Sequence, residues 1–247
     1  MRNPDSWKPS KFEVSDKGLW QASGAHVPIG SRLAVDCMAE AYANAVLHHA
    51  CGKLLDLGCG PVPLYGMYRA LVSEVTCVDW PNSLHAVEHV DVYADLNEVL
   101  ELDNVPFDTI IATDVLEHLH SPDALFETAK TSLRVGGTLI VGVPFLYWVH
   151  EAPHDYYRYT AFALRHMASK AGLEVMSISP YAGAPEVLSD LLAKIFGSRP
   201  RVAQMAYNIC KIALKAKVVR KLSLATRESI PLGYVMIARR PLLESSS

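Results

Sequence analysis

The sequence lacks the marks of several protein classes. Its cysteines are few and scattered, with no Cys-x-x-Cys pair: Cys37, Cys51, Cys59, Cys77 and Cys210. This spacing argues against a disulfide framework or a cysteine zinc site, and it fits a reducing cytoplasm. Residues 1–17 hold no apolar run of the kind that a secretory signal needs. The most apolar late stretch, 202–219, contains three lysines, so we expect no transmembrane helix.

A strong excess of one charge is also missing. The formal net charge is −3, so no overall basic field is available to hold nucleic acid. One class of enzymes that modify nucleic-acid bases carries an Asn/Asp-Pro-Pro-Tyr/Phe motif, whereas this chain has Asp114, Val115, Leu116 and Glu117 at the corresponding place. We therefore expect no nucleic acid among its partners.

What the sequence does contain is a large apolar fraction in a regular order. Half of the 247 residues are hydrophobic, which is enough for a substantial core. We expect strands at 53–57, 74–78, 89–93, 109–113, 138–143, 174–179 and 234–239. We expect helices at 31–50, 64–73, 96–101, 121–133 and 160–171. This alternation predicts an α/β fold with a mostly parallel sheet and helices on both faces.

The chain divides into four predicted parts. An irregular N-terminal segment or lid (1–30) precedes the core (31–184), and the last strand and tail (228–247) follow a helical insertion (185–227). The insertion is expected to form two helices separated by Gly197 and Pro200. No acid stands between Asp190 and Glu228, whereas nine basic residues do. A helix pair packed on the sheet, contact with an anionic membrane surface, an anionic substrate and a homodimer interface are the alternatives.

The turn after the first core strand predicts a cofactor site. Gly58 and Gly60 let the backbone pass close to a ligand. Pro63 occupies the third position of Gly-x-Gly-x-x-Gly, which disfavours a dinucleotide and a nicotinamide dehydrogenase but not a nucleoside without phosphates. Asp79 and Asp95 end the next two strands, where they suit ribose hydroxyls and an adenine amino group. An ordinary tight turn and helix caps are the alternative readings of these residues.

Taken together, these segments resemble class I S-adenosylmethionine-dependent methyltransferases, close to the type-11 small-molecule group. The matching stretches are 53–60, 78–79, 95–96 and 107–145, and the resemblance spans about residues 30–180. It implies a Rossmann-like, seven-stranded sheet with an antiparallel last strand. It also implies S-adenosyl-L-methionine as cofactor and S-adenosyl-L-homocysteine as product.

The resemblance also assigns the cofactor contacts. Asp56 and the backbone from Gly58 through Cys59 to Gly60 would hold the methionine end. Asp79 would bind the ribose, Asp95 and Leu96 the adenine, and Asp114 would close the pocket after the fourth strand.

The loop after the fifth strand, 144–160, predicts the acceptor site, because it leaves the carboxyl edge of the sheet. His154 is the first candidate for a general base, oriented by Asp155 or Glu151, and His118 is the second. Arg158 suits an anionic group of the substrate, although pairing with Asp155 is the alternative. His150 and Tyr156 complete the predicted substrate contacts.

One pattern in this loop imitates a zinc protease. His150 and His154 stand in a His-Glu-x-x-His sequence, which binds zinc when both histidines share one face of a helix. Pro153 costs about 3 kcal/mol in a helix interior. We therefore expect a loop here and no metal cofactor.

The predicted function is methyl transfer to a hydroxyl of a small molecule or glycan, such as a sugar or nucleotide sugar, with a histidine base. A lipid-linked, isoprenoid or secondary-metabolite acceptor at a membrane surface is the alternative. A nucleic-acid methyltransferase and a non-catalytic binding protein are less favoured. The expected location is the cytoplasm, with peripheral contact at the inner face of the membrane as a further option.

Overall fold

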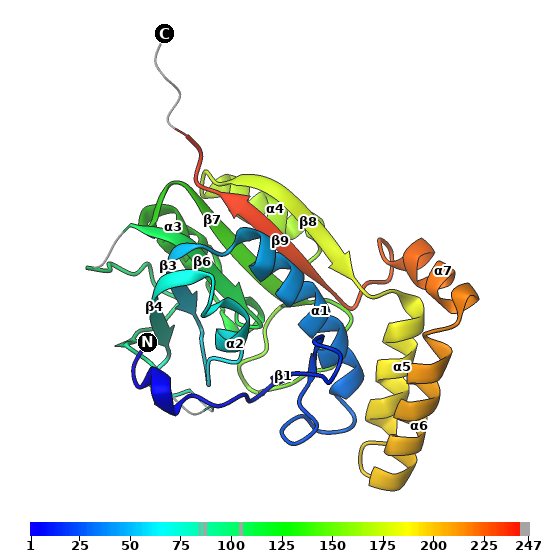
Figure 1. Ribbon diagram of the computed structural model, residues 1–247. Coiled ribbons are helices and arrows are strands. Elements are labelled where there is room, and N and C mark those ends of the chain that lie inside the picture. Colours follow the sequence, from blue (N-terminus) through cyan, green and yellow to red (C-terminus); the bar gives the residue numbers. More distant parts are fainter. Residues whose placement is uncertain (84, 86–87, 104–105, 243–247) are drawn as a thin grey trace.

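The computed structural model describes residues 1–83, 85, 88–103 and 106–242, and within them one large sheet organises the chain (Figure 1). Its strands lie in the order β5-β4-β3-β6-β7-β9-β8. They are β3 (Gly52–Leu57), β4 (Val72–Asp79), β5 (Val92–Tyr93), β6 (Phe107–Thr113), β7 (Leu133–Pro144), β8 (Glu174–Tyr181) and β9 (Gly233–Arg239). The strand β9 is antiparallel to β7 and β8, and the other pairs are parallel. The predicted α/β, Rossmann-like sheet with an antiparallel last strand is confirmed.

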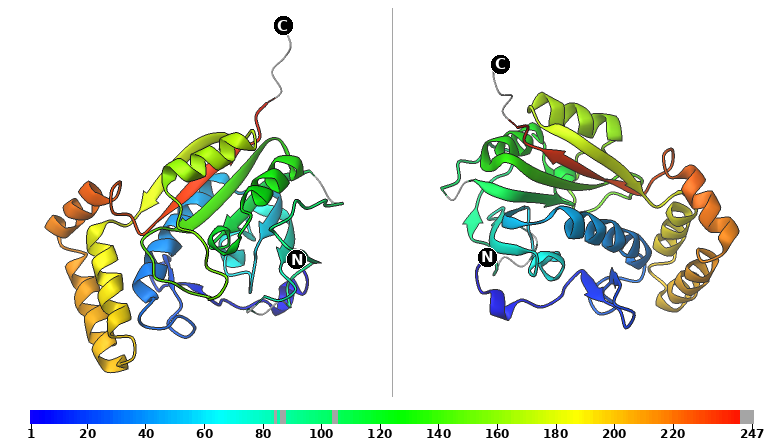
Figure 2. Two further views of the ribbon diagram at one scale, coloured as in Figure 1. Left: turned by 180° about the vertical axis from the view of Figure 1, so that it is seen from behind. Right: turned by 45° about the horizontal axis from the view of Figure 1, so that its top comes forward.

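Helices cover both faces of this sheet (Figures 1 and 2). On one face α1 (Arg32–His49) and α2 (Tyr65–Tyr68) share a hydrophobic core with Leu54 of β3. On the other face α3 (Asp123–Ser132) and α4 (Ala161–Lys170) share a second core with Leu55. Neighbouring residues of a strand point to opposite faces, so β3 contributes to both cores at once.

The N-terminal segment is more regular than its sequence predicts. A short 3-10 helix, η1 (Pro4–Ser6), precedes a hairpin of β1 (Phe12–Val14) and β2 (Trp20–Ala22). Phe12 is buried, and its ring lies 6.3 Å from that of Tyr42 on α1. The hairpin strands are three residues long, too short to show an alternating pattern, and packing on α1 stabilises them.

Of the helices predicted in the core, one is shorter than expected and one is absent from the described residues. The helix expected at 64–73 is the four-residue α2, because β4 already begins at Val72. The helix expected at 96–101 is a turn, in which Asp95 Oδ1 accepts hydrogen bonds from the backbone N–H and side-chain amide of Asn97, at 2.9 and 2.8 Å. This local side-chain bond competes with helix formation.

The insertion forms three helices in place of the two expected: α5 (Ala184–Ile195), α6 (Pro200–Ala213) and α7 (Lys217–Thr226). No glycine or proline stands between α6 and α7, so the sequence contains no signal for this break. The helices project from the side of the molecule instead of packing on the sheet (Figures 1 and 2). Helix α5 contacts α1, and α6 and α7 pack against α5. Tyr207 of α6 donates a 2.9 Å hydrogen bond to Asp36 of α1. No helix in the described part of the chain is long and apolar enough to cross a membrane.

Candidate active site

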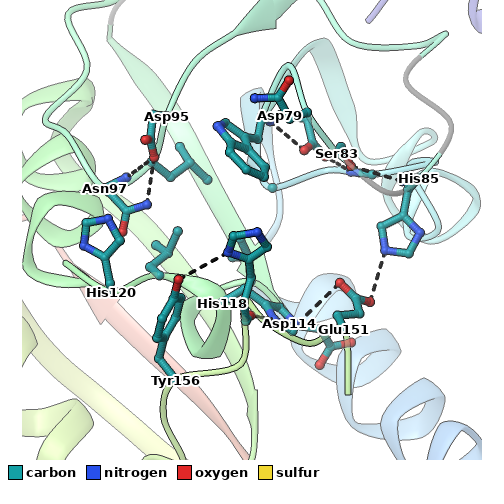
Figure 3. Close-up of a pocket in the computed structure, with 18 residues that line it drawn as sticks. Asp79, Ser83, His85, Asp95, Asn97, Asp114, His118, His120, Glu151 and Tyr156 are labelled. Atoms are coloured by element: carbon teal, nitrogen blue, oxygen red, sulfur yellow. Dashed lines mark hydrogen bonds and ion pairs between the residues drawn. The ribbon is translucent and has the colours of Figure 1, made fainter. Parts of the chain in front are cut away.

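A cavity lies at the carboxyl ends of β3, β4 and β6, where an α/β sheet binds ligands. Figure 3 shows Asp79 and Asp95 on one side of it, with His118, Glu151 and Tyr156 facing them. We call it the first cavity. Its lining residues are Gly58, Gly60, Asp79, Trp80, Asn82, Ser83, His85, Asp95, Leu96, Asn97, Asp114, Val115, His118, Leu119, His120, Glu151, His154 and Tyr156.

The glycine turn forms one wall of the first cavity. Gly58 has φ +71°, and a Cβ there would lie 2.3 Å from Cγ2 of Val115, which follows β6. Gly60 has φ +50°. Both glycines therefore hold a left-handed backbone that other residues rarely adopt, and Gly58 also permits close packing between two strand ends.

The carboxylates and apolar side chains of this cavity suit a nucleoside. Asp79 is almost buried, and it accepts hydrogen bonds from the backbone N–H groups of Gly60 and Trp80, the second at 2.6 Å. Each oxygen retains a lone pair for a ribose hydroxyl. Asp95 is exposed beside the buried Leu96. The arrangement of Asp79, Asp95, Trp80 and Leu96 can accommodate a ribose and an adenine ring, and the assignment of these contacts stays a prediction.

The structure does not bring Asp56 to this wall. Asp56 is 4% exposed and, among the described residues, is absent from the lining of both cavities. It accepts a 2.9 Å hydrogen bond from the Tyr68 hydroxyl. Burial raises the pKa of the Asp56 carboxyl to about 7, against the lowering effect of that hydrogen bond. Asp56 therefore lies behind the lining of both cavities, and its contact with the methionine end stays a prediction.

A second cavity adjoins the first. The two share Gly58, Gly60, His85, Asp114, His118 and Glu151. The N-terminal segment, α1, the turn after β3, the end of β6 with the residues that follow it, and the loop after β7 provide the rest of its wall. These residues are Ser10, Lys11, Phe12, His26, Val27, Pro28, Ser31, Val35, Met38, Cys59, Pro61, Pro63, Thr113, Glu117, Pro144, Tyr147 and His150. Cys59, predicted near the cofactor's methionine end, lies here.

Asp114 stands at the junction of the two cavities. Its φ is +52°, and its carboxylate accepts hydrogen bonds from Tyr42 and from Lys11, both at 2.6 Å. Tyr42 comes from α1 and Lys11 from the N-terminal segment. No periodicity or motif in the sequence links them to Asp114, so sequence reasoning missed both.

Three polar side chains form a cluster in the wall of the second cavity. Nε2 of His118 and Nε2 of His150 each lie 3.9 Å from Oε1 of Glu117. Glu117 is fully buried, and neither carboxylate oxygen has a hydrogen-bond partner in the described part of the chain. Burial raises the pKa of Glu117 well above its ordinary value, and Asp114 adds to the rise. Burial and the nearby His118 lower the pKa of His150, which favours a neutral imidazole.

His154, the first candidate base, lies elsewhere. It lines the first cavity, where its ring is 5.3 Å from that of Trp80 and its Nδ1 is 3.2 Å from the Tyr156 hydroxyl. This position is beside the expected nucleoside. Tyr156, predicted as a substrate contact, lines the same cavity.

The predicted partners of His154 are wrong. Asp155 accepts a 2.9 Å hydrogen bond from the backbone N–H of His150 and two from the Arg158 guanidinium, at 2.5 and 2.8 Å. The Arg158 bond holds the pKa of the Asp155 carboxyl down, at about 2. Glu151 instead contacts His85, at 3.1 Å. Loop geometry aims both acids away from His154.

Arg158 does not line either cavity as far as the described residues show. Besides Asp155, it donates a 2.8 Å hydrogen bond to the carbonyl of Trp148. The alternative reading, in which Arg158 pairs with Asp155, is confirmed. The loop between β7 and α4 is not helical, so the His-Glu-x-x-His pattern does not place its two histidines on one helix face.

The fold and the glycine turn define a class I S-adenosylmethionine-dependent methyltransferase. A family model described as a methyltransferase domain matches residues 36–178, and the chain belongs to that family.

The chain is also similar to individual proteins, two by sequence and one by structure. The chain is 28% identical over 141 residues to a protein of Xanthomonas axonopodis pv. citri named ubiquinone biosynthesis O-methyltransferase, covering 53% of this chain and 58% of that one. A protein of Glaesserella parasuis with the same name is 28% identical over 156 residues, covering 57% and 65%. A methyltransferase structure from Archaeoglobus fulgidus shares the fold with a TM-score of 0.54 at 14% identity, covering 81% and 91%.

Proposed function

We propose that this chain transfers the methyl group of S-adenosylmethionine to a hydroxyl group of a small molecule. The observation that carries the proposal is the junction of the two cavities at Gly58, Asp114 and His118. A nucleoside between Asp79 and Leu96 leaves the methionine end of the cofactor to reach this junction. An acceptor in the second cavity would then meet the methyl group there.

The chemistry requires alignment and the loss of one proton. The acceptor oxygen bonds to the methyl carbon, the S–CH3 bond breaks, and its electron pair stays on sulfur. Holding the oxygen in line with that bond removes several kcal/mol of barrier. The hydroxyl proton must also leave, and the Glu117, His118 and His150 cluster lies in the acceptor wall to assist it. This supports His118 over His154 as the residue nearer the reaction.

An apolar acceptor fits best. Phe12, Val27, Val35 and Met38 give the second cavity an apolar side, and the relatives' names, ubiquinone biosynthesis O-methyltransferase, point to hydroxyl methylation of a small molecule. These features favour the lipid-linked or isoprenoid alternative over a sugar or nucleotide sugar.

A panel assay tests the proposal. The protein is incubated with S-adenosylmethionine and either hydroxylated phenols bearing isoprenoid tails or nucleotide sugars, and mass spectrometry follows each acceptor. We expect one added methyl group on a phenol. Addition to a nucleotide sugar would support the glycan reading, and S-adenosylhomocysteine binding without any methylated product would favour a binding protein.

We also propose that the insertion contacts an anionic membrane surface. Its helices expose large apolar side chains, among them Ile195, Ile209, Ile212 and Val218, the last two at 71% and 75%. Basic residues accompany them and acids are absent between Asp190 and Glu228. Helices that combine basic and apolar side chains bind anionic lipid surfaces by electrostatic attraction and by burying the apolar side chains. Such contact would place the chain at the inner face of the membrane, in the cytoplasm.

The link to the active site is Lys194 of α5. Its Nζ lies 3.9 Å from the ring centroid of Tyr147, which lines the second cavity. An acceptor that arrives from a lipid surface would therefore enter the second cavity beside the helices that contact that surface.

Vesicle co-sedimentation at low salt tests this contact. We expect binding to anionic vesicles, little binding to neutral ones, and a loss when Ile212 and Val218 are both replaced by Asp. Phe162→Asp is the matched control, since Phe162 is 85% exposed on α4 of the core. No binding to anionic vesicles, or a stable dimer that the double variant dissociates, would overturn the membrane proposal.

A further inference from the structure

No hydrogen bond among the described residues joins the three side chains of the Glu117, His118 and His150 cluster. The ligand atoms of the three side chains all lie within 4.8 Å of one another, and the rings of His118 and His150 are 4.8 Å apart. Glu117 is 0% exposed, with both oxygens unpartnered among the described residues. A buried, unpartnered carboxylate is costly, so it is neutralised either by a proton or by a bound cation.

The surroundings direct the lone pair of each imidazole into the cluster. Nδ1 of His118 lies 2.5 Å from the backbone carbonyl of His154. A carbonyl accepts hydrogen bonds and cannot donate one, so the proton is on Nδ1 and Nε2 is a free acceptor. The Nε2 lone pair of His118 is the one near Glu117.

His150 has the same arrangement. Its Nδ1 lies 3.3 Å from the Trp148 carbonyl and 3.4 Å from Oδ2 of Asp155, both acceptors. Nη2 of Arg158 is farther, at 3.5 Å, and already donates to Trp148 and Asp155. A carboxylate behind Nδ1 of a histidine is the usual support of a metal ligand.

We propose that Glu117, His118 and His150 bind a divalent metal ion of the zinc class. Two imidazoles and one carboxylate form the ligand set of catalytic zinc sites, which keep a further position open. Donors around a tetrahedral zinc lie about 3.3 Å apart, from bond lengths of about 2.0–2.1 Å. The 3.9 Å separations seen here need small side-chain movements. All three ligands line the second cavity, so the open position faces the acceptor.

This site differs from the zinc pattern of the sequence. The pattern pairs His150 with His154, which lies beside Trp80 in the first cavity. The structure instead pairs His150 with Glu117 and His118, which follow β6. The expectation of no metal considered His150 with its sequence neighbours and not with these two.

The role of the metal rests on the proposed function, whereas its binding does not. An acceptor hydroxyl bound to the cation would have a lowered pKa. Its proton would leave to solvent, and the oxygen would attack the methyl carbon as the S–CH3 bond breaks. The methyl donor supplies the electrophile, so no oxidant or reductant is needed.

Zinc titration of the untagged, metal-stripped chain tests the site. We expect one zinc ion per chain by elemental analysis, and affinity weaker by about tenfold or more in Glu117→Gln, His118→Ala and His150→Ala. His154→Ala and the exposed surface variant His166→Ala are controls that should keep the affinity. Equal affinity in all five variants, or no bound zinc, would overturn the proposal.

Cobalt substitution separates this site from cysteine binding. We expect visible bands of a four- or five-coordinate ion without a thiolate charge-transfer band, and no change in Cys59→Ser. A thiolate band would overturn the assignment. Thermal unfolding of each metal-free variant shows that it folds, and S-adenosylhomocysteine binding is measured alongside. If the natural chain does not bind S-adenosylhomocysteine, the proposed function is contradicted. If the natural chain binds S-adenosylhomocysteine but no zinc, only the metal site is contradicted.

Discussion

The Lys11 ammonium lies 2.6 Å from Oδ2 of Asp114, which joins the N-terminal segment to the end of β6. Tyr42 donates to the other oxygen of the same carboxylate. Asp114 lies at the boundary of the two cavities. The N-terminal segment is therefore part of the site and not only a cover over the core.

Replacing Lys11 with Met should lower the free energy of unfolding by about 1 kcal/mol. The ion pair is partly exposed, with 31% of the Lys11 side chain accessible, so water screens part of its energy. Urea unfolding measures the change. Lys8→Met, at an exposed position of the same segment, is the control, and equal losses in the two variants would contradict a specific role for Lys11.

Asp79→Ala should weaken S-adenosylhomocysteine binding by about tenfold or more, which corresponds to a loss of about 1.4 kcal/mol or more of binding free energy. The variant loses the acceptor of the Gly60 and Trp80 N–H groups together with the expected ribose contact. Asp95→Ala should weaken binding less, because Asp95 is exposed to water. Calorimetric titration compares both with Asp123→Ala, a surface residue paired with Lys170. A larger effect of Asp95 than of Asp79 would reverse the assignment.

His154→Ala should raise the KM for S-adenosylmethionine more than it lowers kcat, because His154 packs on Trp80 beside the nucleoside. His118→Ala should lower kcat by about 10²-fold or more, the usual range for a group that assists proton removal. Steady-state kinetics with the acceptor found by the panel assay compares the two. A large fall in kcat for His154→Ala at unchanged KM would restore it as the base.

Asp56 should make stability depend on pH. Its carboxyl has a pKa of about 7 in the folded chain against an ordinary value of 3.8, so the folded state binds the proton more tightly. The protonated Asp56 carboxyl therefore adds to the free energy of unfolding. This stabilisation is fully present below pH 3.8 and is lost as the pH rises through about 7. The free energy of unfolding of Asp56→Asn, measured by urea at several pH values, should fall less over this range than that of the natural chain. Asp16→Asn, at an exposed site, should follow the natural chain, and parallel curves for all three would show that Asp56 does not titrate in this way.

Much of the cofactor site could be predicted from the sequence. Gly58, Asp79 and Asp95 stand at or just after the ends of short apolar strands, which are local signals, and parallel strands bring their carboxyl ends to one edge. The elements missed are short or lack a local signal, such as the hairpin of β1 and β2 or the break between α6 and α7. The sequence predicts a helix after Asp95, but the bonds from Asn97 to the Asp95 side chain stabilise a turn, and such side-chain bonds leave no periodic pattern in the sequence.

The sequence by itself determined the α/β class, the glycine turn and the methyl donor, because strand alternation and turn chemistry act between near neighbours. Only the tertiary structure decided the partners of each polar side chain. Lys11 and Tyr42 hydrogen-bond to Asp114, and Arg158 forms an ion pair with Asp155. His150 lies close to Glu117 and His118. Such contacts join segments far apart in the chain, and packing of the loops at the sheet edge sets them.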